Sequence, residues 1–201
     1  MDKEIKKSIS KDEIKEFEQL KFEGPIFCIN SDEDLIKYLP KIKKIKVLGF
    51  DTETKPNFVK GEANQNKVSL LQLASSEEVF LVRLQNITKK KELFQVLGNK
   101  RIKKIGLAIR DDLKALRKLK DFTPNNFVDL QEYVDQFGIE DKSLRKITAI
   151  VLSMRLSKAQ RLSNWENEQL QDSQKVYAAT DAWVCVEIYN VLKKIKNKIK
   201  K

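Results

Sequence analysis

Six short apolar runs, rich in β-branched residues, alternate with helical segments along this chain of 201 residues. We expect strands at 26–29, 45–50, 68–73, 79–84, 102–109 and 127–130. The Ser75-Ser76-Glu77 turn between the third and fourth runs is typical of a hairpin. Early strands in hairpin order, followed by alternating helices and strands, predict an α/β fold with a mixed sheet and helices packed against it.

Helical periodicity is present in seven segments. Ser10 and Glu13 have capping-box spacing and open the first, which we expect to run through Leu20. Ser31 caps the second, and Pro40 is expected to end or interrupt it. The other five lie near residues 93–97, 113–119, 133–137, 143–152 and 172–192.

The length fits a single domain, and the sequence shows no internal repeat and no linker. We therefore expect one main domain over residues 24–192. A helical extension at 1–23 would precede it, and a lysine-rich tail at 193–201 would follow it.

The chain contains no histidine. This excludes catalytic sites of the Ser-His-Asp and Cys-His types, as well as metal sites built on imidazole. Its two cysteines, Cys28 and Cys185, are too few for a disulfide framework, and we expect both to be buried thiols in a reducing compartment. Any chemistry must use carboxylates, tyrosine, lysine, arginine, hydroxyls or bound metal ions.

The formal net charge is +11, and six lysines fall within the last nine residues. A solvated helix end and a nucleic-acid contact explain this tail equally well. The sequence has no apolar run of 18 residues and no signal peptide, so we expect a soluble, intracellular protein without a membrane partner. The location would be cytoplasmic in a prokaryote, with the nucleus as an option in a eukaryote.

Paired acids follow the second predicted strand. Asp51 and Glu53 are two residues apart, so their side chains point to the same face of a strand. Two adjacent carboxylates repel each other unless a cation lies between them, and Mg²⁺ prefers oxygen ligands. A polar turn is the alternative, and for this pair alone it is the better explanation.

Two further acids fall on predicted helices. Asp112 shares a helix face with Leu116 and Leu119, so we expect it, rather than Asp111, to point inward. Tyr177 and Asp181 lie one turn apart on the apolar face of the last helix. A buried Asp needs a hydrogen bond, an ion pair or a metal, and without the other acids a simple pairing would suffice.

Taken together, these residues resemble the three motifs of the DEDD superfamily of 3′–5′ exonucleases, in its tyrosine subclass. The likeness is to the Werner syndrome exonuclease domain and ribonuclease D, and more distantly to the proofreading domains of family A DNA polymerases. It covers roughly residues 26–192. The supporting segments are Val68 to Leu73, Phe127 to Leu130, Ser163 to Trp165 and Gln174 to Tyr177.

The resemblance implies a ribonuclease H-like mixed sheet and metal-dependent hydrolysis of phosphodiester bonds at the 3′ ends of DNA or RNA, releasing mononucleotides. Two divalent ions, Mg²⁺ or Mn²⁺, would act about 3.5–4 Å apart. Asp51 would bridge both ions, Glu53 and Asp181 would hold the ion on the nucleophile side, and Asp112 would support them directly or through water. Tyr177 would orient the attacking water, a role that the sister subclass gives to histidine.

Contacts to the nucleic acid are expected from Thr52, Thr54 and Lys55. Other candidates are Lys60, Lys67, Lys175 and Trp165, although ordinary surface lysines and a packed tryptophan are the simpler explanations. Related domains often place an apolar wedge after the first motif, where this chain has Lys55-Pro56 before Phe58. Ribonuclease D continues into further helical domains, which we do not expect in a chain that stops at Lys201.

Two other functions are compatible with the fold. One is a non-catalytic module that binds nucleic acid, and such a module would be expected to lack some of the four acids. The other is an accessory exonuclease subunit of a polymerase or helicase.

Overall fold

The computed structural model describes residues 5–56 and 67–199, and six strands form one sheet in it. They are β1 (Ile26–Ile29), β2 (Val47–Thr54), β3 (Val68–Ala74), β4 (Val79–Arg83), β5 (Lys103–Gly106) and β6 (Phe127–Asp129). Their order is β1-β4-β3-β2-β5-β6. The β2–β3 and β3–β4 pairs are antiparallel, whereas β1–β4, β2–β5 and β5–β6 are parallel. The predicted mixed sheet is confirmed.

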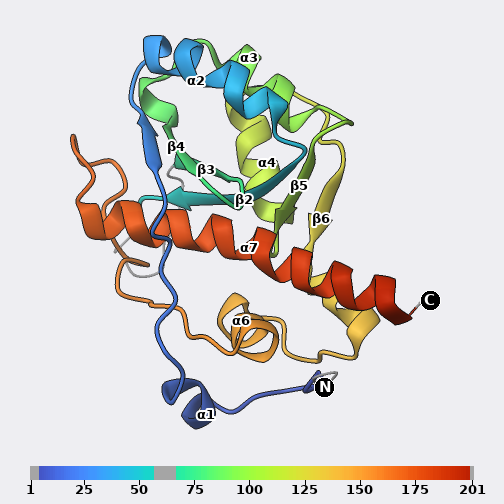
Figure 1. Cartoon of the computed structure of the whole chain (residues 1–201). Coiled ribbons are helices and arrows are strands. Elements are labelled where there is room, and N and C mark those ends of the chain that lie inside the picture. The colour runs from blue at the N-terminus through green and yellow to red at the C-terminus, as the bar shows by residue number, and fades with distance from the viewer. Residues whose placement is uncertain (1–4, 57–66, 200–201) are drawn as a thin grey trace.

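Helices cover both faces of this sheet. They are α1 (Lys11–Lys15), α2 (Asp32–Lys44), α3 (Lys90–Leu97), α4 (Arg110–Leu119), α5 (Leu130–Tyr133), α6 (Leu144–Leu152) and α7 (Asp172–Ile199). Two 3₁₀ turns, η1 (Leu84–Asn86) and η2 (Val134–Phe137), complete the described elements. Helices α2, α3 and α4 pack on one face, and α7 crosses the other with α6 beyond it (Figure 1).

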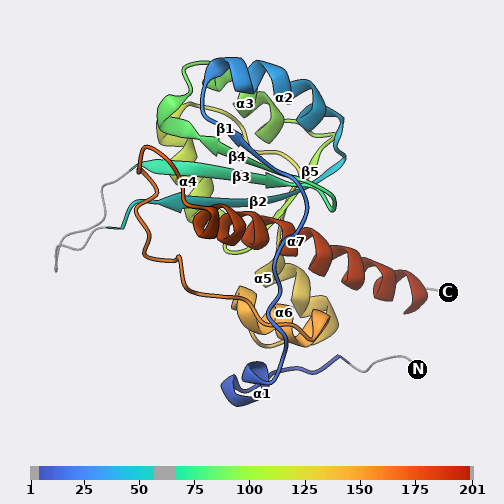
Figure 2. The same cartoon turned by 60° about the vertical axis from the view of Figure 1, so that its left-hand side comes forward.

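The layers follow from alternation along the strands. Leu71 and Leu73 of β3 belong to the apolar cluster beneath α2, α3 and α4. Leu70 and Ala74 of the same strand belong to a separate cluster with the small residues of α7, among them Ala178. Turned by 60°, the molecule shows α7 running under the sheet and α2 above it (Figure 2).

A close approach between α7 and β2 fixes the position of the helix. A Cβ atom added at Gly49 would lie 1.9 Å from the carbonyl oxygen of Ala182, so only glycine allows this contact. The residue after Gly49 and Phe50 on β2 is Asp51, and the residue before Ala182 on α7 is Asp181. The contact therefore brings the acidic segments of the strand and the helix together.

Two predicted helices have different limits in the structure. The first keeps the Ser10–Glu13 capping box but ends at Lys15 rather than Leu20. The chain then extends beside residue 155, and the Leu20 N–H donates to the Arg155 carbonyl at 2.8 Å. The expectation that Pro40 ends or interrupts α2 is wrong, because Pro40 lies inside the helix on its exposed side, where water can satisfy the carbonyl that it leaves unpaired.

Two predicted strands also differ. β2 does not stop at Phe50 but continues to Thr54, because Asp51 and Glu53 pair with Gln72 and Leu70 of β3. β5 ends at Gly106 rather than at residue 109. The chain leaves the sheet there because Ala108 has a φ of 54°, and its N–H donates to the Asp129 carboxylate instead of to a strand.

The N-terminal segment, predicted as an extension, is packed against the rest of the chain. Ile9 and Ile14 are buried in the cluster formed with α6 and α7, and the Ile9 N–H donates to Asp141. At the other end, α7 remains helical into the lysine-rich tail as far as Ile199. Within the described residues no helix is both long and apolar enough to cross a membrane.

Candidate active site

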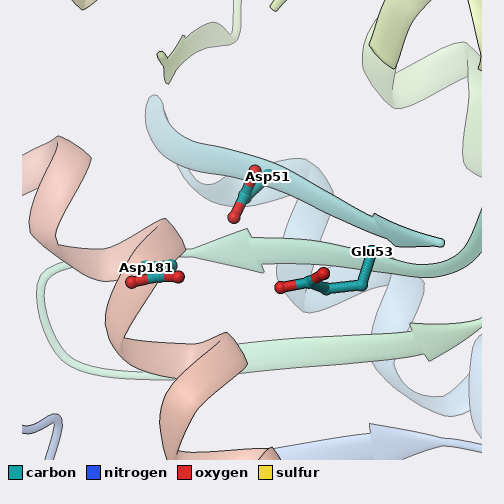
Figure 3. A group of neighbouring side chains, drawn as sticks. All are labelled: Asp51, Glu53 and Asp181. Atoms are coloured by element: carbon teal, nitrogen blue, oxygen red, sulfur yellow. The ribbon is translucent and has the colours of Figure 1, made fainter. Parts of the chain in front are cut away.

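Three carboxyl groups face a common space between β2 and α7 (Figure 3). Asp51 and Glu53 come from β2, and Asp181 comes from α7. One oxygen from each lies within 4.8 Å of the others. The i, i+2 spacing on the strand and the Gly49–Ala182 contact together produce this arrangement, which we call the acidic cluster.

The fourth predicted acid lies beside this cluster. Asp112 stands in the first turn of α4 and is half-buried, whereas its neighbour Asp111 is exposed. The Thr52 hydroxyl donates a 2.5 Å hydrogen bond to Asp112. Since Thr52 points to the opposite face of β2 from Asp51 and Glu53, Asp112 approaches from the α4 side of the strand.

The electrostatics of the cluster favour protonated acids. Burial raises the pKa of Asp51 well above its ordinary value, and the carboxyls of Asp181 and Glu53 raise it further. Burial, with repulsion from Asp181, raises the pKa of Glu53 to about 8. Burial also raises the pKa of Asp181 to about 7, although a hydrogen bond from Tyr177 lowers it in part.

The pKa of Asp112 is raised to about 6, mainly by burial and against the lowering effect of the Thr52 hydrogen bond. Burial, followed by repulsion from Asp181 and Glu53, raises the pKa of Tyr177 above its ordinary value of 10. Tyr177 is therefore a neutral phenol throughout the physiological range. It can donate or accept a hydrogen bond but cannot serve as a base.

These residues fit a divalent cation. Among the ion pairs between described residues, none includes any of the four acids, so no lysine or arginine of that part compensates them. Carboxylate oxygens are the ligands that Mg²⁺ and Mn²⁺ prefer. A cation held between Asp51, Glu53 and Asp181 would offset the burial that raises all three pKa values and the repulsion that adds to it at Asp51 and Glu53.

An amide next to the cluster was not anticipated. Gln72 is fully buried on β3 directly opposite Asp51, and neither its amide oxygen nor its nitrogen has a hydrogen-bond partner. Side chains opposite each other in an antiparallel pair lie about 4.5–5.5 Å apart at Cβ. In the sequence, the only sign of this residue is a single amide side chain within the apolar run 68–74. Which residue lies opposite it depends on the register between β3 and β2.

Asp129 is a second residue that pattern analysis did not assign. At the end of β6 it accepts hydrogen bonds from the N–H groups of Ala108 at 2.9 Å and Ile109 at 3.1 Å. It also caps α5 through the N–H of Gln131. These bonds hold the left-handed backbone at Ala108 that leads into α4, and therefore set where Asp112 stands.

The residues predicted to contact nucleic acid lie in different surroundings, and some of them already have partners within the protein. Thr52 faces Asp112, and Thr54 ends β2 after a bulge. The Lys55 ammonium lies 3.4 Å from Glu166. Trp165 is fully buried with its ring 6.2 Å from that of Tyr177, so it packs within the fold and is not available to stack on a base.

The other lysines predicted to contact nucleic acid also differ in their surroundings. Lys67 is exposed, and Lys175 pairs with Asp172 at 2.9 Å. Lys60 and Phe58 lie outside the described residues. Cys185 is buried and Cys28 half-buried, and both are free thiols.

Comparison with known proteins gives a consistent result. A family model described as 3′–5′ exonuclease matches residues 26–197. The bifunctional 3′–5′ exonuclease/ATP-dependent helicase WRN of Mus musculus is 34% identical over 152 residues, covering 73% of this chain and 11% of that protein. Ribonuclease D of Haemophilus influenzae is 28% identical over 172 residues, covering 85% of this chain and 42% of that one. The chain thus spans less than half the length of either relative.

The fold has solved counterparts as well. The crystal structure of the Aedes aegypti Nibbler EXO domain superposes with a TM-score of 0.78 at 22% identity, over 90% of this chain and 94% of that one. This likeness confirms the ribonuclease H-like mixed sheet that the sequence motifs implied. On the match of the family model to most of its length, the chain belongs to the 3′–5′ exonuclease family of the DEDD superfamily.

Proposed function

We propose that this chain is a metal-dependent 3′–5′ exonuclease that hydrolyses phosphodiester bonds at nucleic-acid 3′ ends and releases mononucleotides. The observation that carries the proposal is the acidic cluster, in which three carboxyls within 4.8 Å of one another lack any cationic partner among the described residues. Membership of the exonuclease family supplies the reaction class.

The residues have separate roles in this proposal. Asp51 offers an oxygen within 4.8 Å of those of both Glu53 and Asp181, and in this proposal it would be the ligand shared by the two ions. Glu53 and Asp181 would hold the ion on the nucleophile side. Asp112, which reaches β2 from the α4 face through Thr52, would support the second ion directly or through water. Two divalent ions of the Mg²⁺ or Mn²⁺ type, when bound, supply positive charge to the attacking and leaving oxygens of an in-line displacement.

Tyr177 would orient the attacking water. Its hydroxyl is one helical turn from Asp181 and close enough for a hydrogen bond to that carboxyl. Because the phenol stays neutral, it acts by holding a hydrogen bond and not by removing the proton. Trp165 packs beside its ring and limits the orientations that the phenol can take.

The test uses oligonucleotides labelled at either end, as DNA and as RNA, with Mg²⁺, Mn²⁺ or EDTA. We expect metal-dependent shortening from the 3′ end, which a 5′ label displays as a ladder and a 3′ label as an immediate mononucleotide. Asp51→Asn and Asp181→Asn should abolish it while retaining the fold. Binding without any shortening would refute the proposal and indicate a non-catalytic binding module instead.

A further inference from the structure

A second feature lies directly beside the acidic cluster. A cavity of about 640 Å³ opens next to Tyr177 and Asp181, between the start of α6 and the loop at 156–161. Asp181 is the one acidic residue in its lining. Six basic residues share that lining, and we call the cavity the basic cleft: Lys11, Lys142, Arg145, Lys146, Lys158 and Arg161.

Most of this positive charge is uncompensated. Lys142 pairs with Asp135, and Lys146 pairs with Asp141 at 2.6 Å. The other four basic side chains form no ion pair with any described residue. The Nε of Arg145 is buried without a hydrogen-bond partner, so the protein leaves part of this guanidinium unsatisfied.

The start of α6 adds to this charge. Ser143 caps the helix, and its first turn contains Arg145 and Lys146 but no acidic residue. The N-terminal end of a helix carries a partial positive charge, which is usually balanced by acids in the first turn. Here the helix end and the basic side chains reinforce each other, so the cleft favours an anionic ligand.

On the basis of the proposed function, we propose that the basic cleft binds the phosphates of a single nucleic-acid strand whose 3′ end reaches Tyr177 and Asp181. Phosphate contacts from Lys and Arg position a strand without reading its sequence. A positively charged groove that follows the backbone is the usual means by which a protein binds an unpaired strand.

The strand would pass from the loop at 156–161 to the acidic cluster. Lys158 and Arg161 are exposed on this loop, and Arg145 is half-buried at the start of α6. All three line the cleft together with Tyr177 and Asp181, so each is suited to contact a phosphate of the strand. Binding here requires no metal, because none of these side chains belongs to the acidic cluster.

The test measures binding without cleavage. The probe is a fluorescein-labelled oligothymidylate strand, titrated in EDTA over salt concentrations from about 50 to 200 mM and followed by fluorescence anisotropy. In Lys158→Gln/Arg161→Gln we expect the slope of log K against log salt to become shallower by about 1.4, since each lost contact on a single strand is worth about 0.7. Arg145→Gln should lower it by about 0.7.

A matched control removes the same charge elsewhere. Lys114 and Lys118 line a separate hollow on the outer side of α4, away from Tyr177 and Asp181. Lys114→Gln/Lys118→Gln should keep the wild-type slope. Because Lys158 and Arg161 are exposed, their variant should fold even if the half-buried Arg145→Gln does not, and a thermal melt verifies this.

The inference is overturned if the cleft variant keeps the wild-type slope, or if the α4 control loses as much as the cleft variant. Equal affinity for a blunt duplex of the same length would also overturn it. The assay contains no metal, so a strand that binds in the cleft but is never cleaved would count against the proposed nuclease alone. A strand that is cleaved yet binds the cleft variant normally would count against the cleft alone.

Discussion

Replacing Glu53 by glutamine should stabilise the metal-free protein at alkaline pH. Burial, together with the carboxyls of Asp181 and Asp112, raises the pKa of Glu53 from 4.5 to about 8. In the unfolded chain this carboxyl has its ordinary pKa, so the folded state binds more protons between these two values. The stabilising contribution of the protonated group is therefore lost as pH rises toward 8. Glutamine has no charge and avoids that loss.

The shift sets the expected magnitude. One pKa unit corresponds to about 1.36 kcal/mol, so the difference between glutamine and glutamate has an upper limit of about 5 kcal/mol near pH 9. Near pH 5 the same relation gives a difference in the free energy of unfolding between glutamine and glutamate of less than about 1 kcal/mol. The upper limit is comparable to the total stability of many domains, which is about 5–15 kcal/mol.

Urea unfolding in EDTA at the two pH values measures the free energy of unfolding. Glu16→Gln, at an exposed position just after α1, serves as the control and should stay within about 0.5 kcal/mol of the wild type at both. Added Mg²⁺ should stabilise the wild type by mass action and stabilise Glu53→Gln less. The reasoning fails if Glu53→Gln is no more stable than the wild type near pH 9, or if its gain is the same at both pH values.

Four further changes test other parts of the site. Gly49→Ala places a methyl group against the Ala182 carbonyl and should cost at least about 3 kcal/mol in a urea titration, with loss of nuclease activity as α7 moves. Asp112→Ala should abolish strand shortening, whereas Asp111→Ala, on the exposed side of α4, should retain it. Asp129→Ala removes the acceptor of the Ala108 and Ile109 N–H groups, just before α4, and should destabilise the fold by about 2–4 kcal/mol. The same change should lower kcat more than it raises KM. Mg²⁺ binding near pH 7 should release protons, because the raised pKa values of Glu53 and Asp181 leave these acids partly protonated until the ion binds. Calorimetry in two buffers of different ionisation enthalpy measures this release. Identical binding heats in the two buffers would show that no protons are released.

Local periodicity was sufficient to predict much of the site. Asp51 and Glu53 share a face because strand side chains alternate, and Tyr177 and Asp181 share one because a helix repeats every 3.6 residues. Neither rule says that the two faces meet. That depends on the contact at Gly49, which joins segments more than 130 residues apart.

The missed features depend on contacts that are distant in sequence. Pro40 would end an isolated helix, but burial of Leu35 and Ile42 holds α2 together on both sides of it. Gln72 becomes notable only through its register opposite Asp51. Arg145 looks like an ordinary helix residue until the loop at 156–161 closes a cavity around it.

The absence of histidine limits how this site can activate water. Tyr177 is kept neutral by burial and by the acids around it, so it can direct a water molecule but cannot deprotonate it. Burial raises the pKa values of Glu53 and Asp181 to near neutrality, and repulsion from Asp181 adds to the effect at Glu53. As the proposed ligands of a cation, both would lose that basicity. The same burial and repulsion that disfavour the ionised acids in the metal-free protein would therefore favour binding of the cation. In the proposed mechanism the protein therefore supplies geometry and negative charge, and a bound metal would supply the acidification of the water.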